Sequence, residues 1–295
     1  MDFRVLNYFV AIAREGSITR AAESLNVSQP ALSRQIQDLE NRLGKKLLIR
    51  GSKQTTLTEE GMLLRKRAEE ILELTQKAVA ELRQPDAAIS GDVWVGGGEL
   101  KGMRYIAQTA QSLKQDYPEI KVNLISGNAL DIEERLEKGL IDFAVGMGEI
   151  KSARYGYLPL PSVHVRGLLM RKDSPLALHK YVTPADFEGL PIISPRNTAL
   201  RSSYEKWLGK PFDSLNIVAT FNLIYNATFL VEEGLGYALC LDDLVNTSGD
   251  HSLCFIPNEP RMEVTGGVTW KKHQVFSKAS QKFLERLREI TAQYP

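Results

Sequence analysis

The sequence predicts a small all-α N-terminal domain, a long connecting helix and a larger α/β domain. Three observations support this fold class. Two closely spaced amphipathic patterns fill residues 17–44, an apolar stripe continues through residues 58–84, and strand and helix patterns alternate from residue 91 onward. The length of 295 residues suits about two domains.

Residues 17–44 contain two helices separated by a very short turn at Asn26 and Val27. The first helix carries apolar residues at i, i+3, i+4 and i+7, namely Ile18, Ala21, Ala22 and Leu25. The second carries Leu32, Ile36, Leu39 and Leu43 on one face. Ser17 and Ser28 can cap the two helices, and Gly44 suits a helix end. Helices joined this tightly cross steeply, so we expect a helix-turn-helix.

The outer face of the second helix is polar. Six residues on or beside this face are candidates for reading DNA: Ser28, Gln29, Pro30, Ser33, Arg34 and Gln37. Arginine can bind guanine edges, glutamine can bind adenine edges and serine can bind either. The alternative is an ordinary solvated helix face, but the scarcity of carboxylates near its start favours nucleic acid.

Residues 3–13 read as a third helix that closes the core behind the helix-turn-helix. Residues 45–58 read as a hairpin, the wing of a winged helix, with a Gly-Ser-Lys tip. Arg50 and Lys53 near this tip can reach phosphates or a narrow minor groove. A solvated loop without a partner is the alternative.

Several of these motifs resemble the DNA-binding signature of LysR-type transcriptional regulators. They are Ala21-Ala22, Leu25, the run at residues 27–33, Ile36-x-x-Leu39-Glu40, Leu43-Gly44-x-x-Leu47-Leu48-x-Arg50 and Leu57-Thr58-x-x-Gly61. One departure is Ile49, where the family usually has an aromatic residue. The resemblance implies a sequence-specific DNA-binding transcriptional regulator, an activator, a repressor or both, controlled by a small-molecule effector. Operator DNA and, for an activator, RNA polymerase are then the expected partners.

The charge distribution agrees with DNA binding. The net charge is only +1, yet residues 1–58 hold nine basic and five acidic residues, a local charge of +4 that leaves −3 for the remainder. A basic module on a slightly acidic body is typical of a DNA-binding domain with a separate control domain. We find no signal peptide and no apolar run long enough for a membrane span, so we expect a cytoplasmic protein.

Residues 58–84 read as one long helix with Thr58 as its cap and acidic residues in its first turn. A four-three seam runs along it: Leu64, Ala68, Ile71, Thr75, Ala78 and Leu82. Either this seam packs on the chain's own domains, or it pairs with a second subunit. Pairing is favoured, which predicts a homodimer, or a homotetramer if the effector domains also pair as in the family.

Beyond a hinge at residues 84–91, the βα alternation predicts a mainly parallel sheet with helices on both faces. By resemblance to the family, this region forms two lobes of the periplasmic-binding-protein type II. The predicted organisation has a DNA-binding domain at 1–58, a linker helix and hinge at 59–88, and an effector domain at 89–295. Lobe I comprises 89–161 and 266–295, and lobe II comprises 162–265.

Ligands of open α/β sheets bind at the carboxyl ends of strands. The candidates there are Gly98, Glu99, Leu100, Ser126, Gly127, Gly146, Met147, Ser194, Pro195, Arg196, Phe221 and Asn222. Each taken alone can be a loop or cap residue. Glu99 can cap the helix that follows it or point into the cleft, in which case Ser194 and Arg196 would hold an anionic group of the ligand.

Catalysis and a cofactor have little support. The four histidines are scattered without metal-ligand spacing, and no nucleophile elbow or phosphate-binding loop is present. Cys240 and Cys254 read as core thiols, with a redox switch as the alternative. The competing function is an α/β binding protein or enzyme whose N-terminal helices serve only assembly.

Overall fold

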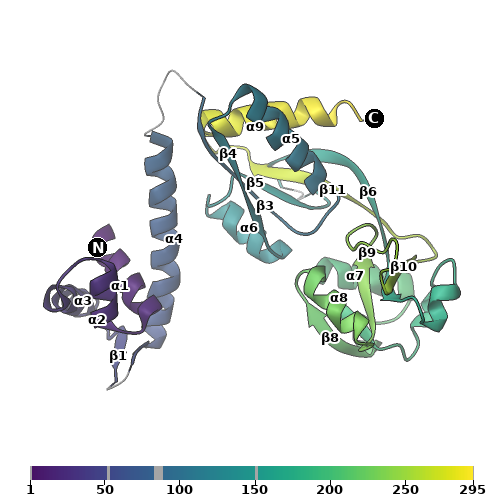
Figure 1. Ribbon diagram of the computed structural model, residues 1–295, viewed down its shortest axis with the longest axis horizontal. Coiled ribbons are helices and arrows are strands. Elements are labelled where there is room, and N and C mark those ends of the chain that lie inside the picture. The colour runs from purple at the N-terminus through teal and green to yellow at the C-terminus, as the bar shows by residue number, and fades with distance from the viewer. Residues whose placement is uncertain (1, 52–53, 83–88, 150–151, 295) are drawn as a thin grey trace. The chain divides into compact units, whose positions relative to one another are not determined.

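The computed structural model describes residues 2–51, 54–82, 89–149 and 152–294 (Figure 1). The chain divides into two compact units, Met1–Arg83 and Gln84–Pro295. The predicted hinge therefore lies mostly outside the described residues, and so does Lys53 at the predicted wing tip. No described helix is long and apolar enough to cross a membrane.

The N-terminal unit is a winged helix-turn-helix followed by a long helix. Its elements are α1 (Phe3–Glu15), α2 (Ile18–Ser24), α3 (Gln29–Leu43), β1 (Leu48–Arg50), β2 (Thr55–Leu57) and α4 (Glu59–Leu82). The predicted stripes of α2 and α3 pack with α1 around Phe9 and Ile12, both fully buried, except for Leu43 at the end of α3, which is 45% exposed. Asn26, at φ 54°, turns the chain between α2 and α3, a conformation that asparagine tolerates.

A buried carboxylate joins α3 to the wing. Glu40 is 4% exposed and accepts hydrogen bonds from the backbone N–H groups of Leu47 at 2.8 Å and Leu48 at 3.2 Å, and from Lys46 Nζ at 3.0 Å. Burial opposes ionisation, but these hydrogen bonds outweigh it, and the pKa of Glu40 is lowered. The carboxylate thus positions the first strand of the wing against α3.

Helix α4 begins as the sequence predicts. The Thr58 hydroxyl accepts a hydrogen bond from Gly61 N–H at 2.9 Å. A Cβ at Gly61 would lie 2.1 Å from the Leu47 carbonyl oxygen, so only glycine permits this approach. The start of the predicted seam packs on the helix-turn-helix core through Leu64, and Ala68 is fully buried, whereas Ile71 and Leu82 are 37% and 87% exposed. The seam therefore has two parts, and only the second lacks a partner within this unit.

The C-terminal unit holds a mixed sheet with helices on both faces. Its strands are β3 (Gly91–Gly97), β4 (Ile120–Ser126), β5 (Phe143–Met147), β6 (Tyr155–Arg171), β7 (Ile192–Pro195), β8 (Ile217–Phe221), β9 (Tyr237–Leu241), β10 (Leu253–Pro257) and β11 (Glu263–Lys271). Its α-helices are α5 (Met103–Asp116), α6 (Ala129–Glu137), α7 (Thr198–Leu208), α8 (Ile224–Glu232) and α9 (Lys278–Thr291), and short 3₁₀ turns cover 175–178, 184–187 and 212–214. Among the described strands the order is β4-β3-β5-β11-β6-β9-β7-β8, with β10 also paired to β6.

Lobe I is the part of this sheet at β3, β4 and β5, with α5 and α9 over one face and α6 over the other (Figure 1). Successive side chains of a strand point to opposite faces of the sheet, so the same strands contribute to the apolar core on each face. Val93 and Val95 of β3 face α5 and α9, while Trp94 faces α6. Two-sided burial is typical of βαβ units.

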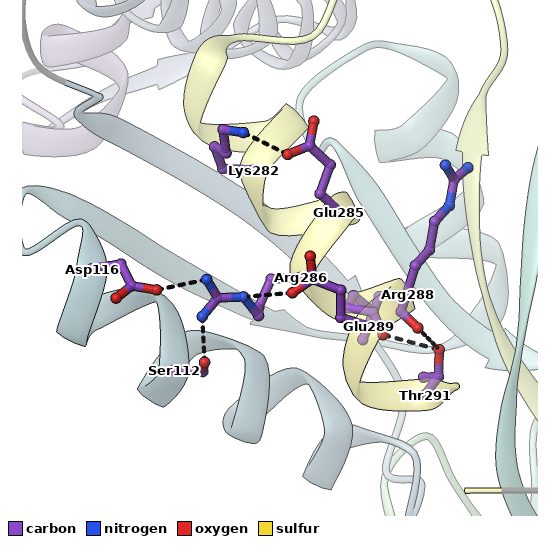
Figure 2. A network of polar contacts seen from close by, with 9 residues as sticks. Ser112, Asp116, Lys282, Glu285, Arg286, Arg288, Glu289 and Thr291 are labelled. Atoms are coloured by element: carbon purple, nitrogen blue, oxygen red, sulfur yellow. Dashed lines mark hydrogen bonds and ion pairs between the residues drawn. The ribbon is translucent and has the colours of Figure 1, made fainter. Parts of the chain in front are cut away.

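Ionic contacts tie α9 to α5 in lobe I (Figure 2). Arg286 on α9 pairs with Asp116 at the end of α5 at 2.6 Å, donates a hydrogen bond to the Ser112 hydroxyl, and pairs with Glu289 at 3.0 Å. These contacts lie at the edge of an apolar interface that includes Phe283 and Leu287. The closing helix is therefore an integral layer of lobe I.

Lobe II repeats this construction with β7, β8, β9 and β10. Leu168, Met170, Ile192 and Leu239 pack with α7, and their strand neighbours Leu169, Ile193, Ala238 and Cys240 pack with α8. Tyr204 of α7 is fully buried and contacts the rings of Phe187, Trp207 and Phe212.

Strands β6 and β11 correct the prediction of a mainly parallel sheet. Strand β6 is 17 residues long, and its first part, Tyr155 to Pro159, pairs with β11. The βαβ pairs β3–β4, β3–β5, β7–β8 and β7–β9 are parallel, but β6 and β11 pair antiparallel with their neighbours. Strand β6 carries the chain from lobe I to lobe II and β11 carries it back, so the two strands run in opposite directions.

We expect Glu40→Ala to lower the free energy of unfolding of the N-terminal unit by about 2–3 kcal/mol, because two buried N–H groups lose a charged acceptor. Chemical denaturation measures the change. The contribution of Glu40 is complete above the ordinary pKa of 4.5 and is lost as the pH falls through the lowered pKa of the folded state. The difference between wild type and variant should therefore shrink in acid.

Asp38→Ala is the matched control, since Asp38 is an exposed carboxylate on the same helix. Its effect should stay within about 0.5 kcal/mol. Equal destabilisation by both substitutions would contradict the role given to Glu40.

Candidate functional site

The outer face of α3 is the first candidate site. Gln29, Arg34 and Gln37 are exposed and Ser33 is half-buried, while Leu32 and Ile36 on the opposite face are fully buried. The first turn of α3 contains no acidic residue. Ser28 holds the N-cap position and is exposed, but its side chain makes no capping hydrogen bond. The helix therefore presents amide, hydroxyl and guanidinium groups from a rigid support.

The described strands of the wing add one exposed cation, Arg50. Arg50 ends β1 and is exposed, and Pro30 in the first turn of α3 is exposed as well. Lys53, the other predicted wing cation, lies outside the described residues. An exposed cation at a wing can contact phosphate, and this contact adds affinity without reading sequence.

A cavity of about 250 Å³ between the two lobes is the second candidate site. It lies at the carboxyl ends of β3, β4, β7 and β8, where ligands of parallel sheets are expected. Ten of the twelve predicted effector residues line it: Gly98, Glu99, Leu100, Gly127, Gly146, Met147, Pro195, Arg196, Phe221 and Asn222.

Ser126 and Ser194 do not line the cavity, which corrects their placement there. Ser126 is exposed at the end of β4, an edge strand, and the cavity wall is formed instead by Gly127, the next residue. Ser194 is 4% exposed, and its hydroxyl donates to the Pro195 carbonyl at 3.2 Å. Alternation along a strand turns one residue in two away from the cavity.

Glu99 lines the cavity, as one of its two expected roles requires, but its carboxylate already has a partner in the opposite lobe. Its carboxylate accepts a hydrogen bond from the N–H of Ile224, the first residue of α8 in lobe II. It therefore caps a helix of the opposite lobe and completes the N-terminus of α8, where negative charge is favoured. Helix α8 has no side-chain cap from its own lobe. The hydrogen bond from Ile224 N–H to Glu99 therefore takes the place of that cap, and it joins the two lobes across the cavity.

A second polar contact joins the lobes near the crossing strands. Lys101 pairs with Asp242 and Asp243, each at 2.8 Å, and Asp242 also accepts a hydrogen bond from Val165 N–H at 2.9 Å. Although burial opposes its charge, these carboxylates raise the pKa of Lys101. His164 is fully buried 3.8 Å from Asp242, and burial lowers its pKa, so the imidazole is neutral at pH 7.

Sequence reasoning missed part of the cavity wall. Arg166, Leu200, Leu239, Cys240 and Thr269 all line it, yet none follows a strand in the predicted manner. Arg166 had a recognisable signal, since it is a charged residue inside an apolar strand pattern. The others come from strand interiors or from α7, and only the packing of the two lobes brings them together.

Cys240 lines the cavity from the α8 side of the sheet and is 8% exposed. Burial raises the pKa of its thiol to about 12. Cys254 is half-buried, and burial raises the pKa of its thiol too. Within the residues that the structure describes, no group of three or more His, Cys, Asp or Glu side chains is placed to hold a metal ion.

The chain is similar to known proteins over nearly its whole length. The model of the bacterial regulatory helix-turn-helix protein of the lysR family matches residues 3–62, and that of the LysR substrate binding domain matches residues 88–292. The HTH-type transcriptional regulator BsdA of Bacillus subtilis is 30% identical, over 97% of this chain and 99% of its own. The Hca operon transcriptional activator HcaR of Escherichia coli is 29% identical, over 99% and 100%.

Solved structures share the fold. Full-length CbnR in complex with its target DNA superposes with a TM-score of 0.75 at 22% identity, covering 98% of this chain and 99% of that one. The structure of CbnR itself, described as a LysR family transcriptional regulator, gives a TM-score of 0.76 at 22% identity, over 99% of both chains.

If the outer face of α3 reads base edges, Gln29→Ala and Ser33→Ala should each reduce the preference for a specific DNA site over random DNA. A good contact is worth about 1–3 kcal/mol of discrimination. Arg50→Ala should instead weaken both DNAs equally and lower the salt slope by about one unit per subunit. Fluorescence anisotropy at several salt concentrations separates the two patterns.

Asn7→Ala removes an exposed polar side chain from α1 and serves as the control, with no expected change in either DNA. Equal losses on specific and random DNA for Gln29→Ala would rule out base reading by that residue.

We expect Cys240 to react slowly with thiol reagents at pH 8 in the native state, because its raised pKa leaves almost no thiolate. A Cys254→Ser variant isolates this thiol, and labelling should become fast only after denaturation. Rapid native labelling would contradict the buried, protonated thiol and would favour a redox role.

Proposed function

Since the chain belongs to the LysR family of bacterial helix-turn-helix regulators, we propose that α3 reads its operator while a small-molecule effector bound between the lobes controls the outcome. The chain is a DNA-binding transcriptional regulator with a substrate-binding domain, and not an enzyme.

The observation that carries the proposal is the outer face of α3. Its exposed side chains, Gln29, Arg34 and Gln37, are the types that pair with base edges, and no acidic residue in the first turn would repel phosphate. The opposite face is fixed by a buried core and by the Glu40 carboxylate. A recognition helix needs such a support to hold its side chains in register with a groove.

We propose that α4 pairs with α4 of a second subunit. Beyond Ala68 no residue of α4 is buried, although Ile71, Leu74, Val79 and Leu82 are large and apolar. Two-fold pairing would present two recognition helices to successive major grooves. Exposed Leu130 on α6, with Tyr225 and Phe229 on α8, would let effector domains pair as well and build a tetramer.

We propose that the effector acts by changing the angle between the lobes. Its cavity is lined from both lobes. The contact Glu99–Ile224 crosses the cavity, and the contact Lys101–Asp242 joins the lobes next to the lining residues Leu100 and Leu241. A ligand shifts such an equilibrium only as far as its affinity differs between the two arrangements. An activating form would also contact RNA polymerase, and the protein would act in the cytoplasm, where operator DNA is found.

A gel-shift with the divergent promoter region beside the chain's own gene tests the function. Full-length protein should retard this fragment at nanomolar concentration in the presence of excess random DNA. Absence of any specific complex, with or without cell metabolites, would favour the competing function of an α/β binding protein whose N-terminal helices serve only assembly.

Ile71→Asp should weaken self-association and operator affinity together, because it places a charge in the proposed seam. Sedimentation velocity should show a smaller assembly at the same protein concentration, and the operator titration should move to higher protein concentration.

Gln76→Asp is the matched control, since it adds the same charge at an exposed position of α4 outside the seam. It should leave the assembly intact. An unchanged assembly and operator affinity for Ile71→Asp would show that the seam does not pair.

A further inference from the structure

Arg166 is a buried charge on the cavity wall. It lies on β6 where the strand enters lobe II, and only 4% of its surface is exposed. Its side chain lies on the α7 face of the sheet, and its guanidinium carbon is 6.0 Å from the centre of the Tyr204 ring. Of the described residues that line the cavity, it is the one buried charged side chain.

Among the described residues, nothing neutralises this charge. Nη1 of Arg166 is buried without a hydrogen-bond partner, and no carboxylate lies within ion-pair distance. The Tyr204 hydroxyl instead accepts a hydrogen bond from Asn258 at 3.2 Å. Burial lowers the pKa of Arg166, yet a guanidinium keeps its proton in a protein. The cavity wall therefore holds a permanent cation without a counter-ion.

An unpaired buried charge is costly, and its cost falls when an anion binds beside it. The other charged groups of the wall differ in this respect. Arg196 and Glu133 are exposed and hydrated, and Glu99 is hydrogen-bonded to the N-terminus of α8. A ligand anion therefore gains the most binding free energy beside Arg166. A guanidinium also fits a carboxylate with two parallel hydrogen bonds.

The remaining wall defines the rest of the ligand. Much of it is apolar: Leu100, Ile132, Val145, Leu200, Ile224 and Leu239. At about 250 Å³ the cavity suits a small molecule. A ligand with several polar groups would leave some of them unpaired against such a surface.

We propose that Arg166 binds the carboxylate of a small apolar monocarboxylic acid, whose hydrocarbon part fills the cavity. This proposal rests on the effector cavity proposed above. It makes Arg166 the residue that selects acids over neutral molecules of the same shape, a role that the exposed Arg196 does not share.

The test measures thermal stability and affinity of the full-length protein with benzoate, cyclohexanecarboxylate and hexanoate, each compared with its primary amide. At least one acid should raise the melting temperature, and its amide should not. Arg166→Met should weaken binding of that acid by about tenfold or more, since a buried site built for hydrogen bonds discriminates strongly. Arg166→Lys keeps the charge without the planar fork and should retain part of the affinity.

Arg166→Met should also raise the melting temperature without any acid, because it removes an unpaired buried charge, whereas a structural arginine would lower it. Arg104→Met is the matched control, since Arg104 is an exposed arginine of α5 outside the cavity lining, and it should keep the response to acids. Stabilisation by none of the acids, or an undiminished response in Arg166→Met, would overturn the proposal. Operator binding without acid, measured in parallel, separates this failure from failure of the regulator function, because Arg166→Met should still bind the operator.

Discussion

The antiparallel pairing of β6 with β11 is the constraint on which the C-terminal unit depends. Both strands contribute to each lobe, so the two βαβ layers share one continuous sheet rather than a flexible linker. The carboxyl ends of β3 and β4 then meet those of β7 and β8 across a single cavity. Because these two strands carry the chain between the lobes, small changes at the cavity would be able to alter the angle between the lobes.

The charges around the cavity divide into two kinds. Lys101 with Asp242, and Glu99 with the N-terminus of α8, are satisfied contacts that link the lobes. Arg166 is the opposite case, because it is buried and lacks a partner among the described residues. A ligand that supplies the missing anion binds beside contacts that hold the lobes together. In the proposed mechanism, ligand binding and the angle between the lobes would be coupled through these neighbouring residues.

The N-terminal unit also contains a buried charged side chain, and this one has partners. Glu40 places one carboxylate under three donors and thereby fixes the wing against α3. The outer face of α3 is exposed, while Leu32, Ile36 and Leu39 on the opposite face are buried in the core. Helix α4 is the exception, since its apolar residues after Ala68 exceed what a small domain can cover. That excess is what a second subunit would bury.

The sequence alone determined the helix-turn-helix, the wing, the extent of α4 and most of the cavity's loop residues. Periodicity, caps and glycines act over a few neighbouring residues, as at Ser17 and Gly44, and strand ends predict where loops meet. The mixed sheet and the link from Glu99 to α8 were decided only by the tertiary structure, as was the isolation of Arg166. Each depends on residues far apart in the chain, for instance 125 positions between Glu99 and Ile224, and no local pattern records such a distance. A charged residue within an apolar strand pattern predicts a buried charge. Only the packing of the tertiary structure shows whether an oppositely charged partner lies beside it.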